Sequence, residues 1–229
     1  MRKELIVDHD PKSALSESIK NIRTNLQFSS VDGNVKNILV TSSTSAEGKS
    51  FIAANLAIAF AKLGSNVLIV DCDMRLGRQH ELFGLSNAVG LSNLLIDDVE
   101  KKYSNYIQKS EIKNVSVLTR GIVPPNPSEL LASDKNKKLV EILASKYDYI
   151  IWDGVPVIGL PDSRIMADLV DKIVIVAAYK KTQIELLKST ADSLENFKSK
   201  IAGVVVNGMP LKGNHYYTSY YSKSYTTDY

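Results

Sequence analysis

The feature of this sequence that most constrains its fold is the run Ser43–Ser50, which follows the apolar stretch Ile38-Leu39-Val40 almost directly. The run ends in Gly48-Lys49-Ser50, the functional half of a Walker A phosphate loop, although Ser43 occupies the place of the usual first glycine. Such a loop joins a buried strand to a helix N-terminus, where backbone N–H groups and the helix dipole attract an anion. The alternative is a serine- and glycine-rich turn that happens to end in Lys-Ser.

We assign the whole loop to phosphate binding. In loops of this type the lysine, here Lys49, reaches the β- and γ-phosphates, and the hydroxyl of Ser50 is the expected Mg²⁺ ligand. The residues predicted to surround the nucleotide phosphates are Ser43, Thr44, Ser45, Ala46, Glu47, Gly48, Lys49 and Ser50.

Bulk properties exclude several classes of protein. A chain of 229 residues fits one α/β domain with a full core. The formal charge is only +3 and the basic residues are spread out, which argues against nucleic acid as a partner. Cys72 is the single cysteine, so no internal disulfide is expected, as suits a reducing cytosol. No apolar run approaches the ~20 residues of a membrane span, so we expect membrane association through a partner.

Strand-like and helix-like segments alternate along the chain. After a polar lead (residues 1–10), Leu15, Ile19, Ile22 and Leu26 form the apolar stripe of a helix over about residues 12–28. Thr182 and Glu185 have the spacing of a capping box that begins a later helix. Further helices are expected over 49–63 and 133–146, and strands over 36–41, 66–71, 115–118, 149–153, 172–178 and 201–207.

This alternation predicts an α/β fold, a mostly parallel sheet with helices on both faces. Together with the phosphate loop, the pattern resembles the MinD/ParA-like P-loop NTPase fold. We assign residues 1–210 to this domain and residues 211–229 to a flexible tyrosine-rich tail, because the tail has almost no aliphatic residues to bury.

Carboxylates follow two of the predicted strands, as Asp71 and Asp73 after one and Asp153 after another. Because parallel strands bring their carboxyl ends to one edge, all three are expected beside the phosphate loop. A lone Asp at a strand end is commonly a helix cap or turn former, but this set suits Mg²⁺. We predict Ser50, Asp73 and Asp153 around Mg²⁺ and Asp71 facing an incoming hydroxyl, with the roles of Asp71 and Asp73 open to reversal.

The last predicted strand ends at Asn207, with Pro210 shortly after it. Asn207 is expected to bind the edge of a purine base, with Pro210 packing near the base. A plain turn after the strand is the alternative.

Tyrosines are concentrated at the C-terminus: six of the eleven lie in the last fourteen residues. One interpretation is a stacking surface for a carbohydrate or a protein. The other is a set of phosphate acceptors, since phosphorylation would make this segment strongly self-repelling. The predicted acceptors are Tyr216, Tyr217, Tyr220, Tyr221, Tyr225 and Tyr229.

Together these motifs resemble those of the bacterial tyrosine kinases, the BY-kinases. Walker A is matched by Ser43–Ser50, Walker A′ by Val67–Arg75 and Walker B by Ile150–Asp153; Pro124–Leu131 also resembles a family segment. The resemblance is greatest to the separate cytoplasmic kinase subunit of Gram-positive capsule and exopolysaccharide synthesis. It implies an ATP- and Mg²⁺-dependent tyrosine kinase that phosphorylates its own tail, between subunits.

The resemblance also implies partners. Glu17, Lys20 and Arg23 match an acidic-basic-basic triplet that assembles a ring of subunits, although without the family they would be an ordinary solvated helix face. The implied partners are other copies of the chain, a transmembrane activator of the polysaccharide co-polymerase type, and a cognate tyrosine phosphatase. The implied location is the cytoplasmic face of the plasma membrane.

The chain departs from the family at four places. Lys20 stands where Arg is more common, and Ala46 where Gly is frequent. Leu76-Gly77 replaces a common Lys-Pro, and Gly154-Val155-Pro156 replaces Thr-Pro-Pro.

Two other functions fit parts of the pattern. A MinD/ParA-type positioning ATPase would share the sheet and the acidic strand ends. However, Thr44 occupies the place of the lysine that marks that group. A nucleotide-binding scaffold without catalysis is the third possibility, because Gly154-Val155 alters the surroundings of Asp153.

Overall fold

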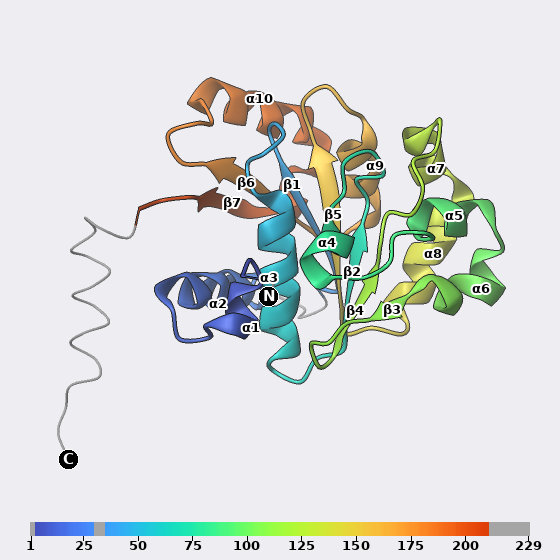
Figure 1. Ribbon diagram of the computed structural model, residues 1–229. Coiled ribbons are helices and arrows are strands. Elements are labelled where there is room, and N and C mark those ends of the chain that lie inside the picture. Colours follow the sequence, from blue (N-terminus) through green and yellow to red (C-terminus); the bar gives the residue numbers. More distant parts are fainter. Residues whose placement is uncertain (1–2, 30–34, 211–229) are drawn as a thin grey trace, which may run out of the picture.

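The structure, a computed structural model, describes residues 3–29 and 35–210 (Figure 1). The six predicted phosphate acceptors, Tyr216, Tyr217, Tyr220, Tyr221, Tyr225 and Tyr229, lie outside these residues. None of the helices in the described ranges combines the length and the apolarity needed to cross a bilayer.

The predicted parallel sheet is confirmed. Seven strands lie in the order β3-β4-β2-β5-β1-β6-β7, and every neighbouring pair is parallel except β3 with β4. The short edge strand β3 is an addition that sequence periodicity did not predict. The strands are β1 (Asn37–Ser42), β2 (Val67–Asp71), β3 (Gln108–Lys109), β4 (Val115–Leu118), β5 (Tyr149–Pro156), β6 (Lys172–Ala178) and β7 (Ile201–Asn207).

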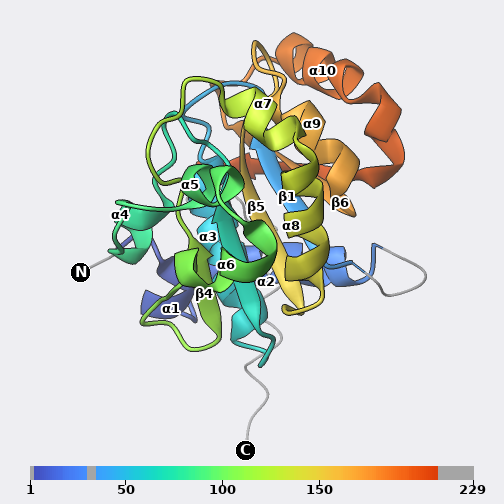
Figure 2. The same ribbon diagram turned by 90° about the vertical axis from the view of Figure 1, so that its right-hand side faces the viewer.

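Helices cover both faces of this sheet, as predicted (Figures 1 and 2). Side chains alternate along each central strand: Ile38 and Val40 pack on one face and Leu39 on the other. The first face is covered by α1 (Ile6–His9), α2 (Ala14–Gln27), α3 (Lys49–Ala61) and α4 (Gln79–Phe83). The second face is covered by α5 (Leu91–Ile96), α6 (Val99–Tyr106), α7 (Pro127–Ala132), α8 (Asp134–Ala144), α9 (Asp162–Leu169), α10 (Ile184–Ser193) and the 3₁₀ helix Glu195–Lys200.

Helix α3, which follows the phosphate loop, is apolar on nearly every side because it lies between the sheet and the N-terminal helices. Its residues from Ile52 to Ala61 are all buried. Asn55 is the polar exception, and its side chain holds the start of the chain: it accepts from the Val7 N–H at 3.1 Å and donates to the Glu4 carbonyl at 2.8 Å. The polar lead expected over residues 1–10 is therefore wrong, since Leu5 and Val7 are buried.

The predicted N-terminal helix forms as α2, capped by Ser13, whose side chain accepts from the Ser16 N–H. Ile19 and Leu26 are buried and Ile22 packs against them, as the periodicity indicates. Leu15, assigned to the same stripe, is exposed instead. It lies in the first turn of α2, one turn ahead of the buried Ile19.

The capping box at Thr182 and Glu185 is also wrong. Helix α10 begins at Ile184 after Gln183, which makes no side-chain cap. The Thr182 hydroxyl accepts from the Ala178 N–H at 2.8 Å and donates to the carboxylate of Glu47. The hydroxyl thus connects the end of β6 to the phosphate loop and does not cap the first turn of α10.

Candidate active site

The phosphate loop turns from β1 into α3, with Gly48 at the helix N-cap. Gly48 has φ +97°, a left-handed conformation that favours glycine. A β-carbon at this position would lie 2.0 Å from Nδ2 of Asn207, so the backbone here passes directly beneath that side chain. The loop therefore depends on this glycine for its conformation, and a side chain here would also displace the amide of Asn207.

The missing first glycine has a local explanation. Ser43 is fully buried, and its Oγ accepts from the hydroxyl of Thr190 on α10 at 2.8 Å. The serine therefore fits because a neighbouring helix supplies a partner for its hydroxyl. Ala46, where the family frequently has glycine, has φ +60°, so this alanine adopts a conformation that glycine would adopt without strain.

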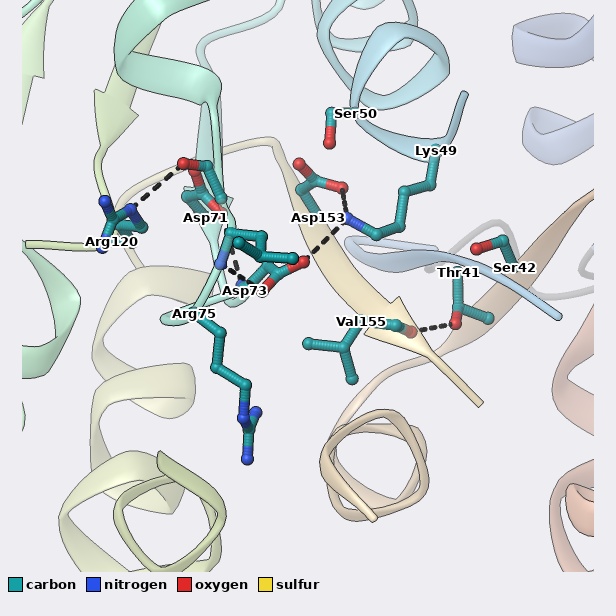
Figure 3. A network of polar contacts seen from close by, with 12 residues as sticks. Thr41, Ser42, Lys49, Ser50, Asp71, Asp73, Arg75, Arg120, Asp153 and Val155 are labelled. Atoms are coloured by element: carbon teal, nitrogen blue, oxygen red, sulfur yellow. Dashed lines mark hydrogen bonds and ion pairs between the residues drawn. The ribbon is translucent and has the colours of Figure 1, made fainter. Parts of the chain in front are cut away.

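The acidic residues predicted to meet do so at the end of the loop (Figure 3). Asp71 on β2 and Asp153 on β5 are paired in register across neighbouring parallel strands. The ammonium group of Lys49 lies 3.1 Å from Oδ2 of Asp73 and 3.8 Å from Oδ1 of Asp153. Lys49 thus lies among three carboxylates.

Burial makes the charges of this cluster strongly interdependent. Burial and the nearby Asp153 raise the pKa of Asp71 well above its usual value, against the opposing effects of Lys49 and the Gln79 N–H. Burial also raises the pKa of Asp153, although Lys49 and hydrogen bonds from Gln79 and Ser50 oppose this shift. Burial alone would lower the pKa of Lys49, but attraction from Asp153 and Asp73 outweighs it and the pKa is raised.

The residues present fit a magnesium ion. Oδ1 of Asp153 is buried and has no hydrogen-bond partner among the described residues, although Lys49 is nearby. The hydroxyl of Ser50 is close enough to hydrogen-bond to the same carboxylate. One or two carboxylates beside phosphate oxygens are the usual protein ligands of Mg²⁺. Asp153 and Asp73 are the carboxylates that would hold the ion here.

Asp71 is fully buried, as Asp153 is. Its carboxylate accepts from the Gln79 N–H at 3.0 Å and more weakly from the Asp73 N–H at 3.3 Å. A β-carbon on Gly77 would lie 2.1 Å from Oδ1 of Asp71, so only glycine lets the backbone pass this carboxylate in the observed conformation. The Leu76-Gly77 departure from the family pattern therefore shapes the wall around Asp71.

The departure at Gly154 is likewise accommodated by its neighbours. A β-carbon there would lie 2.8 Å from Cδ1 of Leu39 and 2.9 Å from Oγ of Ser163. The Thr41 hydroxyl donates to the Val155 carbonyl at 2.6 Å (Figure 3). The Ser163 hydroxyl donates to the same carbonyl, also at 2.6 Å. The space beside Gly154 is thus filled by side chains from β1 and α9.

Arg75 of the Walker A′ segment points away from Lys49 (Figure 3). It forms an ion pair with Asp162, a buried residue of α9. Asp162 also accepts from the Ser128 hydroxyl at 2.5 Å, which links the Walker A′ loop to α7 and α9. Sequence reasoning missed Asp162 and Ser128, although Ser128 lies within the family-like segment Pro124–Leu131.

At the predicted base-binding end, Asn207 lies over the phosphate loop and donates from Nδ2 to the Glu47 carbonyl at 3.1 Å. Pro210 is exposed at the end of the described residues. Contact of either residue with a purine base stays a prediction.

Glu47 braces the phosphate loop internally and joins it to the segment that precedes α10. Its carboxylate is buried, accepts from the Thr44 N–H at 2.9 Å and also accepts from the Thr182 hydroxyl. We expect Thr182→Val to weaken nucleotide binding by about 1 kcal/mol or more, because the loop carboxylate loses a charge-assisted hydrogen bond.

Calorimetric titration with Mg-ATP would measure this loss, and Thr24→Val on α2 is the matched control. The Thr24 hydroxyl donates to the Lys20 carbonyl of its own helix at 2.9 Å, remote from the loop. Equal affinities of the Thr182→Val variant and the unsubstituted chain would contradict the expectation.

The triplet predicted to assemble subunits lies on α2. Lys20 is paired with Glu17 at 2.7 Å and donates to the Pro11 carbonyl at 2.6 Å. Arg23 donates to the Ala59 carbonyl at 3.2 Å, near the end of α3. All three contacts are within one chain, and a role in assembly stays a prediction.

Comparison with known proteins shows similarity over nearly the whole chain. Residues 35–204 match the family model described as an AAA domain. The chain is 39% identical to CapB of Staphylococcus aureus, covering 96% of this chain and 95% of the relative. It is 38% identical to tyrosine-protein kinase YwqD of Bacillus subtilis, covering 97% and 93%.

Solved structures agree with this relationship. The chimerical protein CapA2B2 superposes with a TM-score of 0.86 at 39% identity, over 91% of each chain. MinD of Pyrococcus horikoshii, solved with Mg-ADP, gives a TM-score of 0.58 at 24% identity over 76% of this chain and 68% of that one, a likeness of fold alone. The Walker A lysine meets the carboxylates of Walker A′ and Walker B at one edge of the sheet. The chain belongs to the bacterial tyrosine kinase family, of the CapB and YwqD type.

Proposed function

We propose that this chain is an ATP- and Mg²⁺-dependent protein-tyrosine kinase whose main acceptor is its own C-terminal tyrosine cluster. The observation that carries the proposal is the buried cluster in which Lys49 lies between Asp73 and Asp153, at the N-terminus of the phosphate-loop helix. Similarity to CapB and YwqD over nearly the full length supports it.

The proposed roles follow from the positions of the side chains. The loop N–H groups and Lys49 bind the phosphates and stabilise the charge that develops on the transferred phosphoryl group. Ser50, Asp73 and Asp153 would hold Mg²⁺, which when bound would neutralise charge on the nucleotide phosphates. In the transfer, the bond from the γ-phosphorus to the β–γ bridging oxygen breaks, and a bond to the tyrosine oxygen forms.

We assign the proton of the tyrosine hydroxyl to Asp71. Burial and Asp153 raise the pKa of Asp71, which makes this carboxylate a stronger proton acceptor. The segment from Asp73 to Gly77 encloses this carboxylate, so the hydroxyl reaches it only when that segment shifts.

The wider function that we propose is the control of capsular or exopolysaccharide synthesis at the cytoplasmic face of the plasma membrane. A transmembrane activator is proposed from the family resemblance; the solved relative, the chimerical protein CapA2B2, has CapA as well as CapB in its name, which supports it. We also propose that the chain assembles into a ring through Glu17, Lys20 and Arg23, and that phosphate is transferred between subunits. Asn207 and Pro210 are proposed to contact the base of the nucleotide. A tyrosine phosphatase is proposed to remove the phosphate.

The test is to incubate the full chain with Mg-ATP, with and without the cytoplasmic segment of a candidate activator, and to map phosphate by mass spectrometry. We expect phosphate on Tyr216–Tyr229, increased by the activator segment. A variant with all six of these tyrosines changed to phenylalanine should retain nucleotide binding but incorporate little phosphate.

Mixing two variants distinguishes transfer between subunits from transfer within one. One variant carries Lys49→Met and an intact tail, and the other carries the six phenylalanines and an intact Lys49. Phosphate on the first variant is expected. ATP hydrolysis without phosphotyrosine would instead favour a MinD/ParA-type ATPase, and nucleotide binding with neither activity would favour a scaffold.

A further inference from the structure

Gln79, the first residue of α4, touches three parts of the active site at once. Its side chain is fully buried. Its Nε2 donates to Oδ2 of Asp153 at 2.8 Å and to the Ser50 carbonyl at 3.1 Å, and its backbone N–H donates to Asp71. No predicted motif included this residue, because a glutamine after Walker A′ has no distinctive spacing.

The chemistry of the amide fixes the direction of these contacts. Both neighbours of Nε2 are oxygens that only accept, so a rotated amide would set Oε1 against a carboxylate and a carbonyl. Both hydrogens of the NH₂ group are therefore committed. The amide orients the Asp153 carboxylate by occupying one of its oxygens.

The other oxygen of Asp153 is left for a ligand. Oδ1 is buried, has no hydrogen-bond partner in the described part of the chain, and lies on the side of Lys49. Since Oδ2 is bonded to Gln79, rotation of the carboxylate would break that hydrogen bond. The orientation of this metal ligand thus depends on a neutral side chain from a different element.

We propose that Gln79 is a positioning residue of the magnesium site, which holds Asp153 with its free oxygen toward Mg²⁺ and ties the start of α3 to the same carboxylate. This inference rests on the proposed function, because it deepens the account of the same nucleotide site. Loss of such an outer partner usually lowers metal affinity by about 10- to 100-fold.

The test measures Mg²⁺-dependent binding of a fluorescent ATP analogue to the full chain. Gln79→Met keeps the length of the side chain and removes both donors. We expect the Mg²⁺ concentration for half-maximal binding to rise about 10- to 100-fold, while binding in EDTA changes little. Gln79→Asn, which keeps the amide but cannot span both acceptors, should shift the Mg²⁺ requirement in the same direction if the methionine variant does not fold.

Asn136→Leu is the matched control, because Asn136 is also a fully buried amide but lies on α8 and donates to the Leu131 carbonyl at 2.8 Å. It should lower the melting temperature without changing the Mg²⁺ requirement. An unchanged requirement in both Gln79 variants would overturn the inference, as would a shift of the same size in Asn136→Leu.

This readout is separate from phosphate transfer. A chain that binds the analogue with the expected Mg²⁺ dependence but phosphorylates no tyrosine would overturn the proposed kinase and leave the role of Gln79 standing. Analogue binding that needs no Mg²⁺ in the unsubstituted chain would overturn both.

Discussion

Replacing Lys49 with methionine is expected to lower transfer of phosphate to the tail by about 10³-fold or more, because one preorganised cation is removed from the transferred phosphoryl group. Phosphotyrosine formed over a time course with Mg-ATP and the activator segment would measure the loss. If the Lys49→Met variant retained a tenth of the activity, Lys49 would not have the role proposed for it in phosphate transfer.

The same substitution should destabilise the metal-free protein. Lys49 is paired with Asp73 and Asp153 in a site where its side chain is only 11% exposed, so its removal leaves buried carboxylates without a cation. Breaking a buried pair in this way costs about 3 kcal/mol or more. Chemical denaturation without nucleotide would measure the loss.

Lys62→Met is the matched control for both measurements. Lys62 is exposed and paired with Asp8 at 2.6 Å on the surface. Exposed pairs of this kind contribute under about 1 kcal/mol, so this variant should keep both its stability and its activity.

Asp71→Asn is expected to have opposite effects on activity and stability. Transfer to tyrosine should fall by about 10²-fold or more, since the amide cannot accept the proton of the hydroxyl. The metal-free protein should become more stable at neutral pH by about 1 kcal/mol, because a carboxylate that repels Asp153 in a buried site has lost its charge.

The stability difference should depend on pH in a defined direction. Unfolded Asp71 ionises near its ordinary value, about 4, whereas in the folded chain its pKa is raised. Between the two pKa values the folded state binds this proton and the unfolded state does not. The free energy of unfolding therefore falls as pH rises, until Asp71 has ionised in the folded state as well. The Asp71→Asn substitution would remove the contribution of Asp71 to this pH dependence. The contribution of Asp153, whose pKa is also raised, would remain.

Melting temperatures of the metal-free chain from pH 4 upward would check this expectation. Asp8→Asn, at an exposed position, should follow the unsubstituted chain apart from a small offset. A destabilised Asp71→Asn variant at neutral pH would show that the hydrogen bonds from Gln79 and Asp73 outweigh the repulsion. Comparison with Asp73→Asn would test the assignment of roles between the two residues.

The sequence predicted the sheet because its strands are short β-branched runs that alternate with helices, a pattern that few architectures share. It also predicted that Asp71 and Asp153 would meet, because carboxyl ends of parallel strands share an edge. Both predictions depend on periodicity and topology, which local sequence records directly.

Contacts between distant positions were not predictable in this way. Gln79 reaches Asp153 across 74 positions, and Thr182 reaches Glu47 across 135. In each case a polar side chain binds a buried partner on another element, and the residues next to it in the sequence do not indicate that partner. Thr182 therefore has the sequence spacing of a helix cap, although its hydroxyl binds Glu47 of the phosphate loop.

The serine at the start of the phosphate loop has an evolutionary consequence. Its hydroxyl is buried and bonded to Thr190, 147 positions later. A descendant with glycine at position 43 would leave the Thr190 hydroxyl with only its own helix carbonyl, at Leu186, as a partner. Valine or alanine at position 190 would then cost little, so these two positions should change together as lineages of this kinase diverge.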